Sequence, residues 1–146
     1  MTTLTFKIIE NPSKEQIDCI GKPLWEYNVS KVGHYQRQSS FTTYAYNENN
    51  EFLGGLHGWF QFSWLVIGQL YIDEAQRHAG IGSQLLAASE QFAIEHGILN
   101  ARLNTGSFQA PDFYKKNGYE IFAQLDVIVP NGSTQIDYFM KKKLLR

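Results

Sequence analysis

The sequence predicts an α/β protein with a mixed, mostly antiparallel sheet of about seven strands flanked by about four helices. Apolar segments with the period of a strand alternate along the chain with segments of helical period. In addition, residues 64–72 form an apolar strand that leads into a glycine-rich turn and a helix, a unit typical of α/β sheets. No repeat, linker or low-complexity tract divides the chain, so we expect a single domain over residues 1–146.

The first part of the chain is expected to combine a strand, helical segments and a loop. Ser13 and Gln16 have the spacing of a capping box, in which each residue satisfies a backbone N–H of the other. Gly21 and Pro23 are poor helix residues, and we expect them to interrupt the helix that follows. The expected elements are a strand at Leu4–Ile8, helical segments on both sides of that interruption as far as about Lys31, and a polar loop over residues 33–41.

The remainder of the chain alternates between strands and helices. Residues 47–50 have turn chemistry and predict a hairpin. Gly54, Gly55 and Gly58 lie in the return strand and predict a bulge or a close backbone approach. The expected strands are Thr42–Tyr46, Glu51–Phe60, Trp64–Ile72, Ala101–Asn104, Tyr119–Val129 and Gln135–Leu144, and the expected helices are 81–96 and Pro111–Asn117.

The glycine-rich turn at residues 77–82 is the first candidate site. A helix that starts in such a turn leaves backbone N–H groups unpaired at the positive end of its dipole, which favours an anion such as a phosphate. A P-loop needs Lys-Ser/Thr after its last glycine, but Ser83 and Gln84 stand there, and a dinucleotide fingerprint needs a small residue where Leu85 stands. A glycine-rich helix start without a ligand remains an alternative at this point.

Composition excludes several classes of protein. The chain has 43% hydrophobic residues and a net charge of −1, so it is not expected to be disordered or to bind nucleic acid. It has no apolar run long enough for a membrane span and no signal-peptide block, so we expect no membrane association and a cytoplasmic location. Cys19 is the single cysteine, which suits a reducing compartment and is expected to be a packed thiol.

Arg77-x-x-Gly80-x-Gly82 resembles the Q/R-x-x-G-x-G/A signature of the GCN5-related N-acetyltransferase (GNAT) family. A second stretch resembles the pattern that the family carries in the loop and helix after its fifth strand. The matching residues are Ala110, Phe113, Tyr114, Lys116, Gly118 and Tyr119. Ser107 stands where the family has Asn, which puts one polar contact to the coenzyme's pantetheine arm in question. The resemblance covers nearly the whole chain and implies a single-domain GNAT-like fold.

The resemblance implies that the chain binds acetyl-coenzyme A (acetyl-CoA) as acetyl donor and needs no metal. It implies that the turn holds the pyrophosphate, that backbone N–H groups at the end of the 64–72 strand meet the pantetheine and thioester, and that Tyr114 is the acid that meets the departing sulfur. The implied coenzyme-binding residues are Leu70, Tyr71, Ile72, Arg77, His78, Ala79, Gly80, Ile81, Gly82, Ser83, Ser107 and Phe113.

Acetyl transfer also needs a neutral amine, and an alkyl amine with a pKa near 10.4 is mostly protonated at pH 7. Some family members carry a carboxylate for this purpose on the strand that matches Trp64–Ile72, but here that strand has no acid. Glu26 and Asp73 remain the candidates for a base. No Cys or Ser has an evident base partner, so we expect direct attack of the amine rather than an acetyl-enzyme.

The expected function is therefore transfer of an acetyl group from acetyl-CoA to a primary amine of a small molecule or peptide. By the resemblance, the early helices, the loop at 33–41 and the last two strands select the acceptor, whose identity the sequence leaves open. A homodimer is possible through late aromatic strand residues such as Tyr138 and Phe139. The alternative is a non-catalytic module that senses acyl-CoA or an adenine nucleotide through the same turn.

Overall fold

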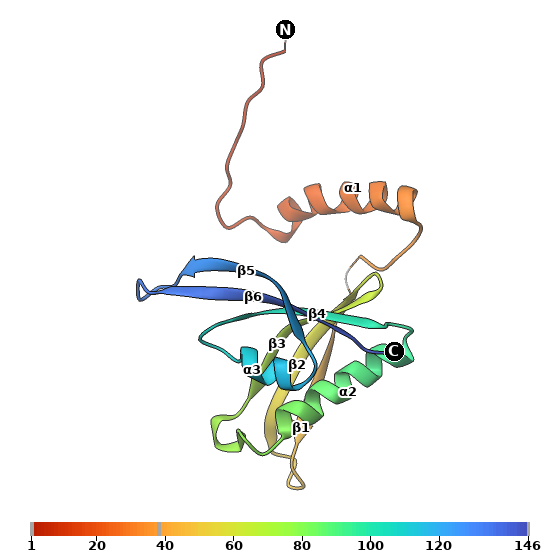
Figure 1. Ribbon diagram of the computed structural model, residues 1–146. Coiled ribbons are helices and arrows are strands. Elements are labelled where there is room, and N and C mark those ends of the chain that lie inside the picture. Colours follow the sequence, from red (N-terminus) through yellow and green to blue (C-terminus); the bar gives the residue numbers. More distant parts are fainter. Residues whose placement is uncertain (1, 38, 146) are drawn as a thin grey trace. The chain divides into compact units, whose positions relative to one another are not determined.

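The computed structural model describes residues 2–37 and 39–145. By its internal contacts the chain divides into two compact units, residues 1–38 and 39–146, which we describe separately. The first unit contains one helix, and the second contains a sheet with its helices (Figure 1). The expectation of one domain over residues 1–146 stays a prediction.

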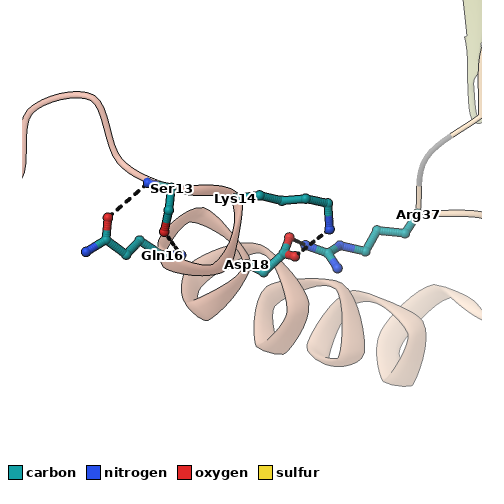
Figure 2. Close-up of polar contacts among 5 residues, drawn as sticks. All are labelled: Ser13, Lys14, Gln16, Asp18 and Arg37. Carbon is teal, nitrogen blue, oxygen red and sulfur yellow. Dashed lines mark hydrogen bonds and ion pairs between the residues drawn. The ribbon is translucent and has the colours of Figure 1, made fainter.

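Helix α1 (Lys14–Val32) begins at the predicted capping box. The Ser13 hydroxyl accepts a hydrogen bond from the Gln16 backbone N–H at 3.1 Å, and the Ser13 N–H donates to the Gln16 side chain at 2.9 Å (Figure 2). The helix then continues without a break through Pro23. The predicted interruption at Gly21 and Pro23 is therefore wrong.

Contacts on both sides of Pro23 explain the continuous helix. A proline inside a helix costs about 3 kcal/mol, so other interactions must offset it. The guanidinium of Arg37 donates to Asp18 at 2.6 Å (Figure 2). It also passes so close to Gly21 that a Cβ there would lie 2.8 Å from it. Beyond Pro23, the Trp25 indole donates to the Tyr35 carbonyl at 3.1 Å. Gly21 is thus a packing residue that makes room for Arg37.

The strand predicted at residues 4–8 is not formed. Leu4, Phe6 and Ile8 are exposed and belong to no sheet ladder. Alternation of apolar and polar residues shows that a segment has one face to bury, but a strand also needs a neighbour that supplies its hydrogen bonds. The sequence of the segment does not specify which strand it would pair with.

The second unit contains a six-stranded sheet in the order β1-β2-β3-β4-β6-β5, with β3 and β4 parallel and the other pairs antiparallel. The predicted mixed, mostly antiparallel sheet is confirmed. The described residues hold six strands and three α-helices, fewer than expected, because residues 4–8 are unpaired and the two early helical segments are one helix. The elements are β1 (Phe41–Tyr46), β2 (Phe52–Gln61), β3 (Trp64–Ile72), a 3-10 turn (Glu74–Gln76), α2 (Ile81–Glu95), β4 (Asn100–Gly106), α3 (Pro111–Lys116), β5 (Glu120–Ile128) and β6 (Thr134–Lys143).

The β1–β2 hairpin forms as predicted. The Asn47 side-chain oxygen accepts hydrogen bonds from the backbone N–H groups of Asn49 and Glu51, both at 2.9 Å, and so closes the turn. The register of β2 against β3 shifts between His57 and Gly58. A Cβ at Gly58 would lie 2.9 Å from a carbonyl oxygen of β3, so this glycine marks the predicted close approach of two backbones.

One face of the sheet packs against α2 and α3 and forms the core, and Figure 1 shows α2 lying across strands β1 to β3. A buried polar group ties the layers together. Glu90 of α2 is 8% exposed, and its carboxylate accepts from the Tyr119 hydroxyl at 2.7 Å and the Lys142 ammonium at 2.8 Å. This network fixes α2 and the segment after α3 on the same face. The core residues are Leu56, Leu65, Ile67, Leu85, Leu86, Ala93, Ile98, Ala101, Leu103, Tyr114, Tyr119 and Met140.

Candidate active site

Strands β3 and β4 separate halfway along β3. Their pairing runs from Trp64 opposite Asn100 to Ile67 opposite Leu103 and ends there. Beyond that point β3 pairs only with β2, and β4 pairs only with β6. The edge of β3 that faces β4 is therefore unpaired over residues 68–72, which include the three predicted positions Leu70, Tyr71 and Ile72. Backbone groups on this open edge are available to a ligand.

The glycine-rich turn lies just beyond the open end of β3. Gly80 precedes the helix with a φ of +79°, a left-handed conformation that glycine adopts without strain, and His78 is exposed with a φ of +70°. Ala79 lies between them. Ile81, Gly82 and Ser83 are the first three helical residues, so their N–H groups have no partner within the helix. The glycine-rich turn thus leads directly into a helix, as the sequence predicts.

Two contacts join this turn to the end of β3 and to α3. The Arg77 guanidinium turns back and donates from Nε to the Ile72 carbonyl at 3.1 Å, which leaves its terminal nitrogens for another partner. Gly82 faces the ring of Phe113, and a Cβ there would lie 3.1 Å from two ring carbons and 3.6 Å from Ile72. The helix start, the strand end and α3 therefore meet at Gly82, where a side chain would press against the Phe113 ring.

Tyr114 follows Phe113 in α3 and is buried in the core, in the same cluster as Leu85 and Leu86 of α2. Its ring makes edge contacts with Phe113 and Tyr119, with ring centres 5.1 Å and 5.8 Å apart. Burial raises the pKa of Tyr114 to about 12, so its hydroxyl stays protonated at neutral pH. Tyr119, whose pKa burial and the Glu90 carboxylate also raise, holds the Tyr114 ring from the side of the Glu90 network.

Ser107, at the position of the family's Asn, is engaged by β6. Its hydroxyl donates to the Gln135 side chain at 2.7 Å and accepts from the Ile136 backbone N–H at 3.0 Å. The Ser107 N–H donates in turn to the Ile136 carbonyl at 2.7 Å. The single proton of this hydroxyl is therefore used within the protein, and Ser107 has only an acceptor lone pair to offer a ligand.

The two candidate bases lie in different units. Asp73 directly follows β3, is half-buried, and uses its backbone N–H to pair with the Leu53 carbonyl at 2.8 Å. Glu26 belongs to α1 in the first unit. Sequence reasoning passed over another acid near the separated strands, Asp137 of β6, whose two carboxylate oxygens accept from the Asn104 amide at 3.2 Å and 3.3 Å.

Other predicted features can be compared with the described residues. Cys19 is exposed rather than packed. Tyr138 is partly buried against the core, and pairing of late aromatic strand residues between subunits stays a prediction. Across residues 2–37 and 39–145, no three His, Cys, Asp or Glu side chains group as metal ligands, and no helix is long and apolar enough to cross a bilayer.

A family model described as an acetyltransferase (GNAT) domain matches residues 39–121, more than half of the chain. The chain belongs to the GNAT family. GNAT acetyltransferases use acetyl-CoA, so this protein is an acetyl-CoA-dependent N-acetyltransferase. The matched residues include the β3–turn–α2 unit and α3, so the sequence resemblance is confirmed.

Individual relatives agree with the family assignment. Blasticidin-S acetyltransferase of Streptomyces morookaense is 41% identical over 97 residues, which cover 66% of this GNAT chain and 71% of the relative. The crystal structure of an acetyltransferase from Bacillus cereus is 34% identical, with a TM-score of 0.79 over 94% of this chain and 97% of that one. An aminoglycoside 6'-N-acetyltransferase complexed with coenzyme A has the same fold at 15% identity, with a TM-score of 0.64 over 94% and 96% of the two chains.

Proposed function

We propose that this protein acetylates a primary amine of a small molecule by direct attack of the amine on bound acetyl-CoA. The observation that carries the proposal is the separation of β3 from β4 beside the start of α2, because one continuous path joins an anion site to an open strand edge. The relative from Streptomyces morookaense is named for a small-molecule acceptor, blasticidin S, which supports the same class of acceptor here.

The coenzyme follows that path in our proposal. Its pyrophosphate accepts hydrogen bonds from the N–H groups of residues 79–83, with Arg77 and His78 beside it. The pantetheine arm lies along the open edge of β3, past Phe113 and the Ser107 hydroxyl. The thioester oxygen meets backbone N–H groups of Leu70–Ile72, which stabilise the charge that develops on it.

Tyr114 serves the departing sulfur by hydrogen bonding. With a pKa of about 12 against about 8.5 for a thiol, full proton transfer from Tyr114 to the thiolate is uphill by roughly 5 kcal/mol. A phenol that stays protonated is nevertheless a good donor to a thiolate that forms in a site shielded from water. Tyr114 therefore lowers the barrier by stabilising negative charge on sulfur while the carbon–sulfur bond breaks.

A direct attack also agrees with the environment of the buried Ser89 hydroxyl. Cys19 is exposed and lies in the first unit, and the buried Ser89 hydroxyl is bound to Thr43 and to the Leu85 carbonyl. These bonds join Ser89 to no histidine or carboxylate base, which a covalent acetyl-enzyme would need. The acceptor nitrogen thus loses a proton on its way to the amide, through Asp73 or through water.

The test is a turnover assay with acetyl-CoA and a panel of amines, following free thiol and the mass of the product. The panel contains blasticidin S, aminoglycosides, polyamines, amino acids and a peptide with a free N-terminus. We expect at least one small-molecule amine to be acetylated with one thiol released per acetyl group transferred. Binding of acetyl-CoA without turnover of any amine would instead identify a sensor and overturn the proposal.

A further inference from the structure

The two faces of the sheet differ at the point where β3 and β4 separate. In β4, Leu103 and Thr105 are buried on the side of α2, so Asn104 between them lies on the opposite face. In β6, Tyr138 and Met140 pack into the core, so Asp137 lies on the opposite face as well. Tyr114 belongs to the α2 face, and the two helices cover that face.

Asn104 and Asp137 stand at the mouth of the separation. Asn104 is the first residue of β4 beyond the last β3–β4 pair, Ile67–Leu103. Asp137 belongs to β6 and lies opposite Gly106 of β4. The Asn104 amide donates to both carboxylate oxygens of Asp137, at 3.2 Å and 3.3 Å. These two bonds orient the carboxylate, but a neutral amide leaves its charge uncompensated.

Asp137 has no cationic partner within residues 39–145 as the structure describes them. Strand pairing and alternation place Arg102 and Lys141 on its face, opposite each other and farther from the mouth, with Glu120 across from Lys141. The third carboxylate of the six strands, Asp126, pairs with Ile136 and faces the α2 side. The charged and titratable groups of the strands that share the face of Asp137 are Arg102 of β4, Lys141 and Lys143 of β6, Glu120 of β5, His57 of β2, Tyr71 of β3, and Tyr44 and Tyr46 of β1.

We infer that Asp137, oriented by Asn104, binds a cationic group of the acceptor, so that the preferred acceptors are amines with a second basic group. The inference rests on the proposed function. Because α2 and α3 cover the face of Tyr114, the acceptor reaches the thioester from the face of Asp137. The nitrogen that attacks must be neutral, so the group that pairs with Asp137 is a second one, which stays protonated at pH 7.

The experiment compares matched acceptors that differ only in the second group: putrescine with 4-aminobutanol, and cadaverine with 5-aminopentanol. Initial rates are measured with wild type, Asp137→Asn, Asn104→Leu and Asp126→Asn, the last being a charge-matched control on the other face. We expect wild type to prefer each diamine in kcat/KM by about ten-fold or more, the effect of one charge-assisted contact. Asp137→Asn should abolish the preference by raising KM for the diamines, while leaving the amino alcohols and acetyl-CoA affinity unchanged.

Asn104→Leu should reduce the preference in part, because the carboxylate loses its orienting donor, and Asp126→Asn should keep it. The inference is overturned if Asp137→Asn still prefers the diamines. It is also overturned if wild type acetylates both members of a pair without preferring the diamine. Either result leaves the proposed function standing. Wild type that binds acetyl-CoA and acetylates none of these amines and none of the earlier panel overturns both.

Discussion

A side chain at Gly82 should weaken coenzyme binding by a predictable amount. A Cβ at this position would lie 3.1 Å from two carbons of the Phe113 ring, against an ordinary carbon–carbon contact of about 3.5–4.0 Å. In Gly82→Ala the ring must therefore move by about 0.5 Å. In Gly82→Val two further methyl groups enter the same space, and the first turn of α2 must shift away from Phe113 and Ile72.

The shift moves the N–H groups that are proposed to hold the pyrophosphate. A hydrogen bond to a charged group is worth about 1.5–3 kcal/mol, so losing one weakens binding by roughly ten- to hundred-fold. We expect calorimetry to show coenzyme A binding about ten-fold weaker in Gly82→Ala and more than about hundred-fold weaker in Gly82→Val.

Gly97→Ala is the matched control, because it lies just past the other end of α2. Its φ of +79° makes alanine strained by about 1 kcal/mol, but no atom lies within 4 Å of the added Cβ. This variant should lose stability and keep wild-type coenzyme affinity. Wild-type coenzyme affinity in Gly82→Val would refute the proposal that this turn binds the pyrophosphate. An equal loss of affinity in Gly97→Ala would show that general destabilisation, and not the position of the N–H groups, causes the loss.

Two further predictions concern stability. Glu90→Gln should lower the free energy of unfolding by about 2 kcal/mol in urea titrations, because it removes one half of a largely buried ion pair. The control is Glu95→Gln, an exposed position on the same helix, which should change the free energy of unfolding little. Equal effects of the two substitutions would contradict the role of the Glu90 network. Between pH 10 and pH 12 the unfolded chain loses the Tyr114 proton while the folded chain keeps it, so stability should fall by up to about 1.4 kcal/mol per pH unit from this group. Tyr114→Phe should reduce that slope, and an unchanged slope would show that Tyr114 titrates as in the unfolded chain.

Local patterns predicted the elements whose formation depends mainly on local chemistry. The capping box at Ser13 and the hairpin turn at Asn47 form as expected, since their hydrogen bonds join residues within four positions. The strand, turn and helix over residues 64–95 also form, because an apolar run and a left-handed glycine specify them. The strand at 4–8 and the break at Pro23 fail for the opposite reason, since distant partners decide whether a strand pairs or a helix survives a proline.

The candidate site divides in the same way. The turn at Gly80 and Gly82 can be found from spacing alone. The engagement of Ser107 by β6 and the pairing of Asn104 with Asp137 depend on the register between β4 and β6, across 29 and 33 positions of sequence. No pattern within one segment specifies such a register. Acids and hydroxyls brought together by sheet pairing are therefore the residues that sequence reasoning passes over.

The most direct test of the account is single-turnover release of coenzyme A thiol in wild type and Tyr114→Phe, at saturating amine. The phenylalanine ring keeps the contacts with Phe113 and Tyr119, so folding and coenzyme affinity should stay near those of wild type. The chemical step should slow by about ten-fold or more, or at least roughly 1.4 kcal/mol, because the departing thiolate loses its donor. Equal rates would remove Tyr114 from the mechanism, and a labelled acetyl group that stays on the protein without acceptor would contradict direct transfer.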